Sequence, residues 1–269
     1  MLRERVLVAL ALLIVSVLFV FLGGWAFTAY LTVVLSISAW EYAHIFQTGG
    51  YAPSRPLLTI GVALLILSRA AFGLTISAGL LGLFTLVSMT LHLIAYERGT
   101  ESAALDFVIG LGGLLYLGWV GGYLLSLRQL PEGQWWLLLV VPIVAIGDSG
   151  AYFIGRAFGK HALAARLSPK KTWEGYFGGV ASAMVGGLVL ALFWQRFCPA
   201  ITPALGLGFG ALLGLLTPLG DLGESMLKRS FQVKDSGRLL PGHGGMFDRI
   251  DSWLWAGFLG YFLVLWFGL

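Results

Sequence analysis

The stretch Asp221–Asp251, DLGESMLKRSFQVKDSGRLLPGHGGMFDRID, is a polar run between two apolar segments. It holds five of the 17 Lys and Arg residues and five of the 13 Asp and Glu residues of the chain. The apolar run Trp253–Leu269 follows it and is long enough to cross a bilayer. Carboxylates, cations and the flexible backbone at Gly244 and Gly245 indicate a site at a membrane surface that handles phosphate with the help of a metal ion.

The rest of the chain is apolar. Of its 269 residues, 58% are hydrophobic and 11% are charged, whereas a soluble domain carries about 25% charged residues. Apolar runs of about 20 residues recur and predict an all-α, polytopic membrane bundle of about nine helices. The expected spans are residues 6–22, 25–46, 57–70, 74–95, 104–125, 134–154, 174–195, 203–220 and 252–268. We expect one integrated domain, in which residues 1–130 form a scaffold with lipid access and residues 131–269 form the catalytic half. The single cysteine, Cys198, excludes an internal disulfide and a cysteine cluster.

The positive charges predict the orientation. With nine spans, fourteen Lys and Arg residues fall on one side of the membrane and three on the other, and the richer side is normally cytoplasmic. This distribution places the N-terminus and both polar loops in the cytoplasm and the C-terminus outside. The first apolar run lacks a small-x-small cleavage site, which favours a retained helix over a signal peptide. The lack of an obvious organelle-targeting segment favours a bacterial plasma membrane, and we expect no nucleic-acid partner.

A second polar block surrounds Asp148, which lies deep in the sixth expected span. A carboxylate at the centre of a membrane costs at least about 2.5 kcal/mol, so it should face a polar cavity or a hydrogen-bond partner on another helix. The loop that follows carries Arg156, Lys170 and Lys171, which could bind phosphate or contact anionic lipid heads. The sequence around Lys170 reads as a turn that feeds a helix capped by Thr172. Lysines at a helix N-terminus suit a phosphate.

The carboxylates of the first stretch have the spacing of a metal site. Asp221 follows a Gly- and Pro-interrupted segment at residues 217–220, while Asp248 and Asp251 share one face if that segment is helical. Hard oxygen ligands of this kind suit Mg²⁺. His243 could carry a proton, donate a hydrogen bond to phosphate or only form the turn.

The first half, to about residue 130, carries little chemistry. Glu41, His44 and His92 lie at or near expected helix ends and are interpreted as interfacial polar residues or as packing hydrogen bonds.

Two motifs resemble a known family. The run Ser225-x-Leu227-Lys228-Arg229-x4-Lys234-Asp235-x-Gly237-x2-Leu240-Pro241-x-His243-Gly244-Gly245-Met246-x-Asp248-Arg249-Ile250-Asp251 resembles the signature of phosphatidate cytidylyltransferases (CDP-diacylglycerol synthases). A second block, Asp148-Ser149-Gly150-Ala151-Tyr152 through Gly155-Arg156 to Ser168-Pro169-Lys170-Lys171-Thr172-x-Glu174-Gly175, is also similar to that family. The motifs lie in the C-terminal half, and the first half matches only as a set of apolar spans.

The resemblance implies a membrane enzyme that joins CTP and phosphatidate into CDP-diacylglycerol and pyrophosphate, with Mg²⁺ and as a homodimer. It places the carboxylates of Asp221, Asp248 and Asp251 at the metal and nucleotide, with a second, monovalent cation such as K⁺ as an open alternative. It implies that cationic residues lie near phosphates: Lys170, Lys171, Lys228, Arg229 and Lys234. We assign catalytic roles to Asp221, Asp248, Asp251, Lys228 and Asp148, and substrate contacts also to Arg156, Ser225, His243, Gly244, Gly245 and Arg249.

Other functions stay open at this point. A CTP-dependent lipid-alcohol kinase would share the nucleotide and the bilayer but would release CDP. A CDP-alcohol phosphotransferase would carry the motif D-G-x2-A-R-x8-G-x3-D-x3-D, which is not found. A secondary transporter would explain Asp148 and the interrupted eighth span. The crowding of polar residues on one face of the membrane argues against a transporter.

Overall fold

The computed structural model describes residues 2–240, 242 and 244–267, with side chains from residue 7 onward. By its internal contacts the chain divides into two units. Unit 1 comprises residues 1–125 and 227–250, and unit 2 comprises residues 126–226 and 251–269.

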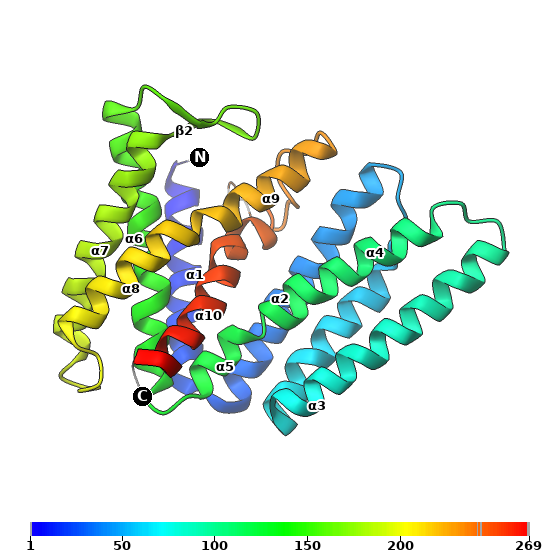
Figure 1. Cartoon of the computed structure of the whole chain (residues 1–269), viewed down its shortest axis with the longest axis horizontal. Helices are drawn as coiled ribbons and strands as arrows, with labels where there is room; N and C mark the ends of the chain where they lie inside the picture. Colours follow the sequence, from blue (N-terminus) through cyan, green and yellow to red (C-terminus); the bar gives the residue numbers. More distant parts are fainter. Residues whose placement is uncertain (1, 241, 243, 268–269) are drawn as a thin grey trace. The chain divides into compact units, whose positions relative to one another are not determined.

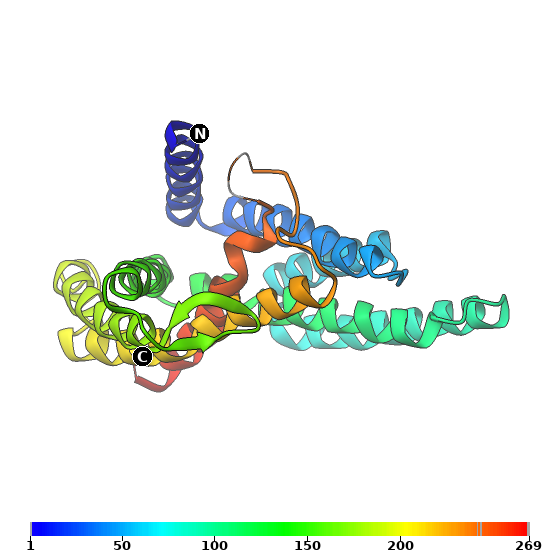
Figure 2. The ribbon, with the colours of Figure 1, turned by 90° about the horizontal axis from the view of Figure 1, so that it is seen from above.

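Unit 1 is a group of packed helices. Helix α2 packs on α3, and α3 packs on α4 and on the π-helical turn η1 that continues α4. Figure 1 labels α2, α3 and α4, and Figure 2 shows the same ribbon from above. Buried aliphatic side chains such as Leu35, Leu65 and Leu117 fill the space between these helices. The elements are α1 (Leu2–Leu22), α2 (Gly24–Thr48), α3 (Arg55–Glu97), α4 (Ala103–Gly113), η1 (Leu114–Val120) and the start of α5 (Tyr123–Gln129).

Helix α3 consists of two arms that fold back on each other at Gly73. Gly73 has φ 77° and ψ −173°, a combination that essentially only glycine adopts. The Ser77 hydroxyl donates to the Leu65 carbonyl at 3.2 Å, although twelve residues of straight helix would separate them by about 18 Å. The reversal confirms the expected break between the spans at residues 57–70 and 74–95.

Unit 2 is built on α6, α7 and α8, which pack in chain order (Figures 1 and 2). A short antiparallel hairpin joins α6 to α7, with Ala162 paired to Thr172 and Ala164 to Ser168. The stretch around Lys170, expected to be a turn, is therefore a strand. The elements are α6 (Gly133–Phe158), β1 (Ala162–Ala164), β2 (Ser168–Thr172), α7 (Trp173–Trp194), α8 (Pro203–Leu216), α9 (Pro218–Ser230) and α10 (Phe247–Phe267), and the last two helices pass from one unit to the other.

The helices match an integral membrane protein, but the expected number of spans is not confirmed. Among the described residues, six helical stretches are long and apolar enough to cross a membrane. The count of six treats the two arms of α3 as one stretch, finds the described part of α1 too short and does not include α2, the expected span at residues 25–46. The six are Arg55–Glu97, Ala103–Gln129, Gly133–Phe158, Trp173–Trp194, Pro203–Ser230 and Phe247–Phe267.

Glycines bring α7 and α8 into backbone contact. A Cβ on Gly187 would meet the carbonyl oxygen of Gly206, and a Cβ on Gly206 would meet that of Gly187, both under 3.0 Å. In a bilayer, where helices are not driven together by hydrophobicity, such small residues allow the close packing that holds them.

We expect Gly206→Val to lower the thermal stability of the purified protein by several degrees. Overpacking costs about 1–3 kcal/mol, and each kcal/mol shifts Tm by about 2–4 °C in a domain of this size. Gly208→Val on the same helix is the control, because nothing lies within 4 Å of a Cβ at Gly208. Equal melting temperatures for the two variants would contradict the packing argument.

Candidate functional site

Four charged side chains of unit 2 form a cluster, the unit 2 cluster: Asp148, Lys171, Asp221 and Asp251. The Lys171 Nζ lies 2.5 Å from Asp221 Oδ2. Asp148 is within electrostatic range of both Asp221 and Lys171. Asp251 interacts electrostatically with Asp221 and Asp148 and is hydrogen-bonded to the Glu224 side chain. Three carboxyl groups of unit 2 therefore lie within electrostatic range of one another, and one of them pairs with Lys171.

The start of α9 places Asp221 in the cluster. Helix α8 ends at Leu216 and α9 begins at Pro218, which confirms the expected interruption and puts Asp221 in the first turn of α9. A Cβ on Gly220 would lie 2.6 Å from the carbonyl oxygen of Asp251. Because glycine has no side chain, the backbone of α9 can approach α10 closely at this point, and the carboxylates of Asp221 and Asp251 come near each other.

The hairpin holds Lys171. Thr172 caps α7 by accepting a hydrogen bond from the Gly175 amide, as the sequence predicts. The Glu174 carboxylate reaches back to accept from the Lys160 amide at 3.1 Å and from the His161 amide at 3.2 Å. The hairpin is thus tied at both ends to the first turn of α7, and Lys171 is presented from its second strand.

Unit 1 carries a second group of polar side chains, the unit 1 cluster: Glu41, Lys228, Ser236 and Asp248. The Lys228 Nζ lies 2.5 Å from Asp248 Oδ1, and both side chains are largely buried, at 12% and 6% exposure. The other Asp248 oxygen accepts from the Ser236 amide at 2.9 Å and from the Gly245 amide at 2.8 Å. Both oxygens of Asp248 therefore already have donors.

The sequence predicts no site role for Glu41, but its interpretation as a residue that forms packing hydrogen bonds is confirmed. This side chain is 6% exposed and accepts hydrogen bonds from the Ser236 hydroxyl at 3.0 Å and from the Phe247 amide at 2.8 Å. The signal in the sequence was a carboxylate within the apolar run of residues 25–46, which needs a partner as Asp148 does.

The expected metal centre is not assembled among the described residues, where no group of three or more His, Cys, Asp and Glu side chains is placed to hold a metal ion. Instead, Lys171 lies against Asp221 and Lys228 lies against Asp248. The donor chemistry of the unit 2 cluster, with carboxylate oxygens in excess of cations, still suits Mg²⁺. For Asp248, metal binding would require Lys228 to leave Oδ1. The ligand set stays a prediction.

The other predicted site residues have individual contacts or lie on the surface. Ser225 Oγ donates to Asp221 Oδ1 at 3.4 Å, and Arg156 donates to the Tyr152 hydroxyl at 3.3 Å. Gly244 has φ 81°, which supports the expectation of a special backbone turn there. His243 lies outside the described residues. Among the cationic residues that the sequence predicts to contact substrate, five have exposed side chains: Arg156, Lys170, Arg229, Lys234 and Arg249.

A polar pocket of about 540 Å³ lies within unit 1. The end of α2 and the loop segment Val233–Arg238 line it, with Lys234, Arg238 and one carboxylate, Asp235, among the lining residues. On the α2 side, the His44 Nδ1 is 2.7 Å from a guanidinium nitrogen of Arg55. Cations outnumber carboxylates around the pocket, so its charge suits an anion.

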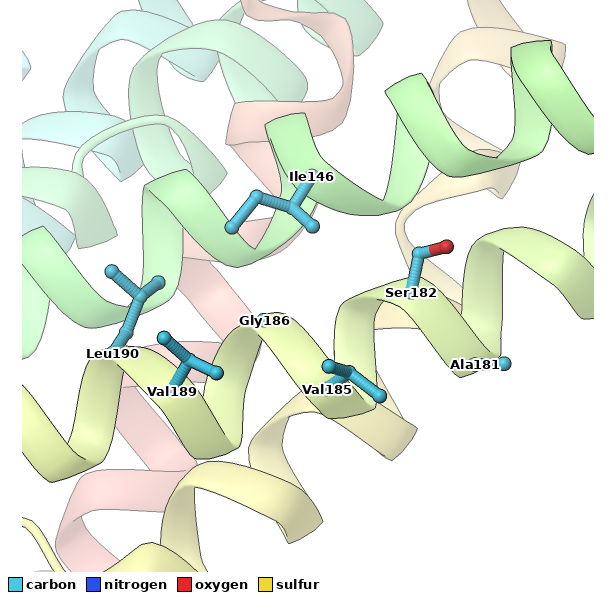
Figure 3. Close-up of a pocket in the computed structure, with 7 residues that line it drawn as sticks. All are labelled: Ile146, Ala181, Ser182, Val185, Gly186, Val189 and Leu190. Atoms are coloured by element: carbon cyan, nitrogen blue, oxygen red, sulfur yellow. The ribbon is translucent and has the colours of Figure 1, made fainter.

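An apolar pocket of about 490 Å³ lies between α6 and α7 in unit 2 (Figure 3). Ile146 comes from α6, and the α7 side is formed by Ala181, Ser182, Val185, Gly186, Val189 and Leu190. None of these residues is charged, so the pocket suits hydrocarbon rather than phosphate.

The chain is similar to known proteins over nearly its whole length. The pattern that describes the cytidylyltransferase family matches residues 3–267. A phosphatidate cytidylyltransferase of Pseudomonas aeruginosa is 37% identical over 258 residues, 94% of this chain and 93% of the relative. Those of Brucella suis and Synechocystis sp. are 35% and 31% identical, each over 97% of this chain and over 92% and 96% of the relatives. With a family match across nearly its full length, the chain belongs to the cytidylyltransferase family.

Proposed function

We propose that the protein transfers a cytidylyl group from CTP to phosphatidate and so forms CDP-diacylglycerol and pyrophosphate. The observation that carries the proposal is the unit 2 cluster, three carboxylates and Lys171 within or beside helices long enough to span a membrane. Charged groups within a membrane-spanning segment are costly and mark functional sites. The relatives named phosphatidate cytidylyltransferase cover more than nine tenths of this chain.

The first obstacle to the reaction is repulsion between two anions, the lipid phosphate and the triphosphate, which grows in a medium of low dielectric constant. Lys171 and Lys228 are paired with carboxylates in the structure, and each can turn its ammonium group toward an incoming phosphate. Lys234 and Arg238 line the polar pocket and are suited to bind the triphosphate and to stabilise the departing pyrophosphate.

We assign the Mg²⁺ ligands to Asp221 and Asp251, with Asp148 near them. When bound, the ion supplies positive charge to the phosphate oxygens on which negative charge develops. In this proposal the carboxylates of Asp221 and Asp251 bind and orient the ion. We assign to Asp248 the role of ordering its loop, because donors occupy both of its oxygens. A second, monovalent cation such as K⁺ remains part of the proposal.

The transfer needs no nucleophile from the protein. A phosphomonoester has its second pKa at about 6, so the lipid phosphate is already an anion at pH 7 and attacks the α-phosphorus of CTP directly. The bond from the α-phosphorus to the bridging oxygen breaks, and pyrophosphate leaves. The apolar pocket beside α6 (Figure 3) suits an acyl chain, because no charged residue lines it.

The test uses CTP labelled at the α- or the γ-phosphorus with the purified protein in detergent. We expect the α-label in the lipid product and the γ-label in pyrophosphate, because only the cytidylyl group is transferred. A lipid-alcohol kinase would place the γ-label in the lipid and release CDP. Lipid labelled by γ-phosphate, or no release of pyrophosphate with phosphatidate present, would overturn the proposal.

We further propose a homodimer in the bacterial plasma membrane, with the N-terminus and both cationic loops in the cytoplasm. The charge distribution of the loops supports the orientation. Residues 1–130 then serve as scaffold and residues 131–269 carry most of the chemistry.

A further inference from the structure

Glu41 is far in sequence from the two family motifs, yet it contacts two residues within the Ser225–Asp251 motif. It lies in the C-terminal third of α2, 195 residues before Ser236 and 206 residues before Phe247 in the chain. All three residues belong to unit 1. We propose that Glu41 is a positioning residue that fixes both ends of the loop of residues 236–247, which leads into α10, and through this loop orients Asp248 and the polar pocket.

The hydrogen bonds of Glu41 reach both ends of the loop. Its Oε2 accepts from the Ser236 hydroxyl, at the first end, and from the Phe247 amide, at the second end. Phe247 is the first residue of α10, so the bond also satisfies one of the amides that a helix leaves open at its start. A single carboxylate oxygen thus holds the two ends of the loop together.

Two glycines let the loop close around this carboxylate. A Cβ on Gly237 would meet the Glu41 Oε1, and a Cβ on Gly245 would meet the Glu41 Oε2, both under 3.0 Å. Neither glycine has a φ in the left-handed region, so backbone conformation does not require them. The close approach of the loop backbone to Glu41 explains why these positions lack side chains.

The Ser236 hydroxyl connects Glu41 to the rest of the unit 1 cluster. It lies 3.0 Å from Glu41 Oε2 and also 3.0 Å from Asp248 Oδ2. Ser236, with Gly237, also lines the polar pocket together with Lys234 and Arg238. Releasing the loop ends would therefore disturb the pocket that we assign to the triphosphate and loosen the donors around Asp248, while unit 2 would keep its own contacts.

The role of Glu41 is tested in the full-length protein with Glu41→Gln, which keeps the size of the side chain but replaces the charged acceptor of both donors by a weaker neutral oxygen or by an NH2 group. We expect amide hydrogen exchange in peptides covering residues 232–246 to accelerate about tenfold to a hundredfold. Exchange in α6 and α7 should stay unchanged. The assignment of the pocket to the triphosphate rests on the proposed cytidylyl transfer. Hydrogen exchange measures the loop without any activity, so its result remains valid even if that transfer is not found.

Steady-state kinetics distinguish a loss of positioning from a general loss of structure. We expect the KM for CTP to rise about tenfold, since the loop ends shape the pocket, and the KM for phosphatidate to stay within about twofold. Ser236→Ala should give a similar defect, and the double variant Glu41→Gln/Ser236→Ala should be no worse than either, because residues of one network are not additive. Glu97→Gln, at an exposed carboxylate on α3, is the control.

Gly237→Ala tests the contact between Glu41 and the loop by a change in the loop itself. We expect it to reproduce the faster exchange of Glu41→Gln, whereas Gly82→Ala, with nothing within 4 Å of its Cβ, should behave as wild type. Unchanged loop exchange in both Glu41→Gln and Gly237→Ala would overturn the proposal. Loss of protection throughout both units would also overturn it, because Glu41 would then serve only the folding of the chain.

Discussion

Replacing Asp221 by Asn is expected to reduce kcat/KM for CDP-diacylglycerol formation on the order of 10³-fold, the scale seen when a preorganised electrostatic group is removed from an active site. The folded state should lose little, because the change also removes repulsion between Asp221 and the carboxylates of Asp148 and Asp251. The measurement combines steady-state kinetics across a Mg²⁺ series with thermal unfolding in detergent. Glu101→Gln, at an exposed carboxylate of unit 1, is the control.

Lys171→Met, at the residue paired with Asp221, should lower the thermal stability more than Asp221→Asn does. Lys171 is the ammonium group paired with Asp221 at 2.5 Å, so its loss leaves the carboxylates of the unit 2 cluster without that cation and should lower the melting temperature as well as activity. Near-normal turnover of Asp221→Asn at saturating Mg²⁺ would contradict the role that we assign to Asp221. Equal stability changes in the two variants would contradict the charge balance of the cluster.

Replacing Lys228 by Met is expected to destabilise the protein more than either Asp221→Asn or Lys171→Met. Lys228 and Asp248 are 12% and 6% exposed, and removing one partner of a buried ion pair costs about 3–5 kcal/mol because the other charge stays buried. With a shift of about 2–4 °C per kcal/mol, the melting temperature should fall clearly below that of Arg98→Gln, which removes an exposed cation of the same unit. Activity should fall together with stability.

The double variant Lys228→Met/Asp248→Asn separates the two effects. It removes both charges, so we expect it to regain much of the lost stability. We expect activity to stay low, because neither the ammonium group that binds phosphate nor the carboxylate that orders the loop is restored. Recovery of activity along with stability would show that this pair is only structural.

Much of the helical architecture could be predicted from the sequence, because its signals are local. The change from apolar to polar composition locates the helices, Pro218 marks the start of α9, and Thr172 has the side chain that caps α7. The reversal at Gly73 falls in the short gap left between two apolar runs. The number of spans was not confirmed because length and composition of an apolar run do not decide whether it crosses the membrane alone.

The sequence predicts which residues could form the site but not which of them contact one another. The sequence singles out Lys171, Asp221, Lys228 and Asp248, yet nothing local states that Lys171 pairs with Asp221 or that Lys228 pairs with Asp248. The hairpin was missed because its ends depend on Glu174 reaching back to the Lys160 and His161 amides. The contact of Glu41 with Ser236 spans 195 residues, a distance over which periodicity and spacing carry no information.

That separation has a consequence for how the protein is made. At a synthesis rate of about 5–20 residues per second, the ribosome needs roughly 10–40 s after Glu41 to reach Ser236. Throughout that interval the nascent chain holds a carboxylate in α2 whose eventual donors do not yet exist. A polypeptide that stops before residue 236 never supplies them, so Glu41 of a truncated product lacks both hydrogen bonds that the finished polypeptide provides.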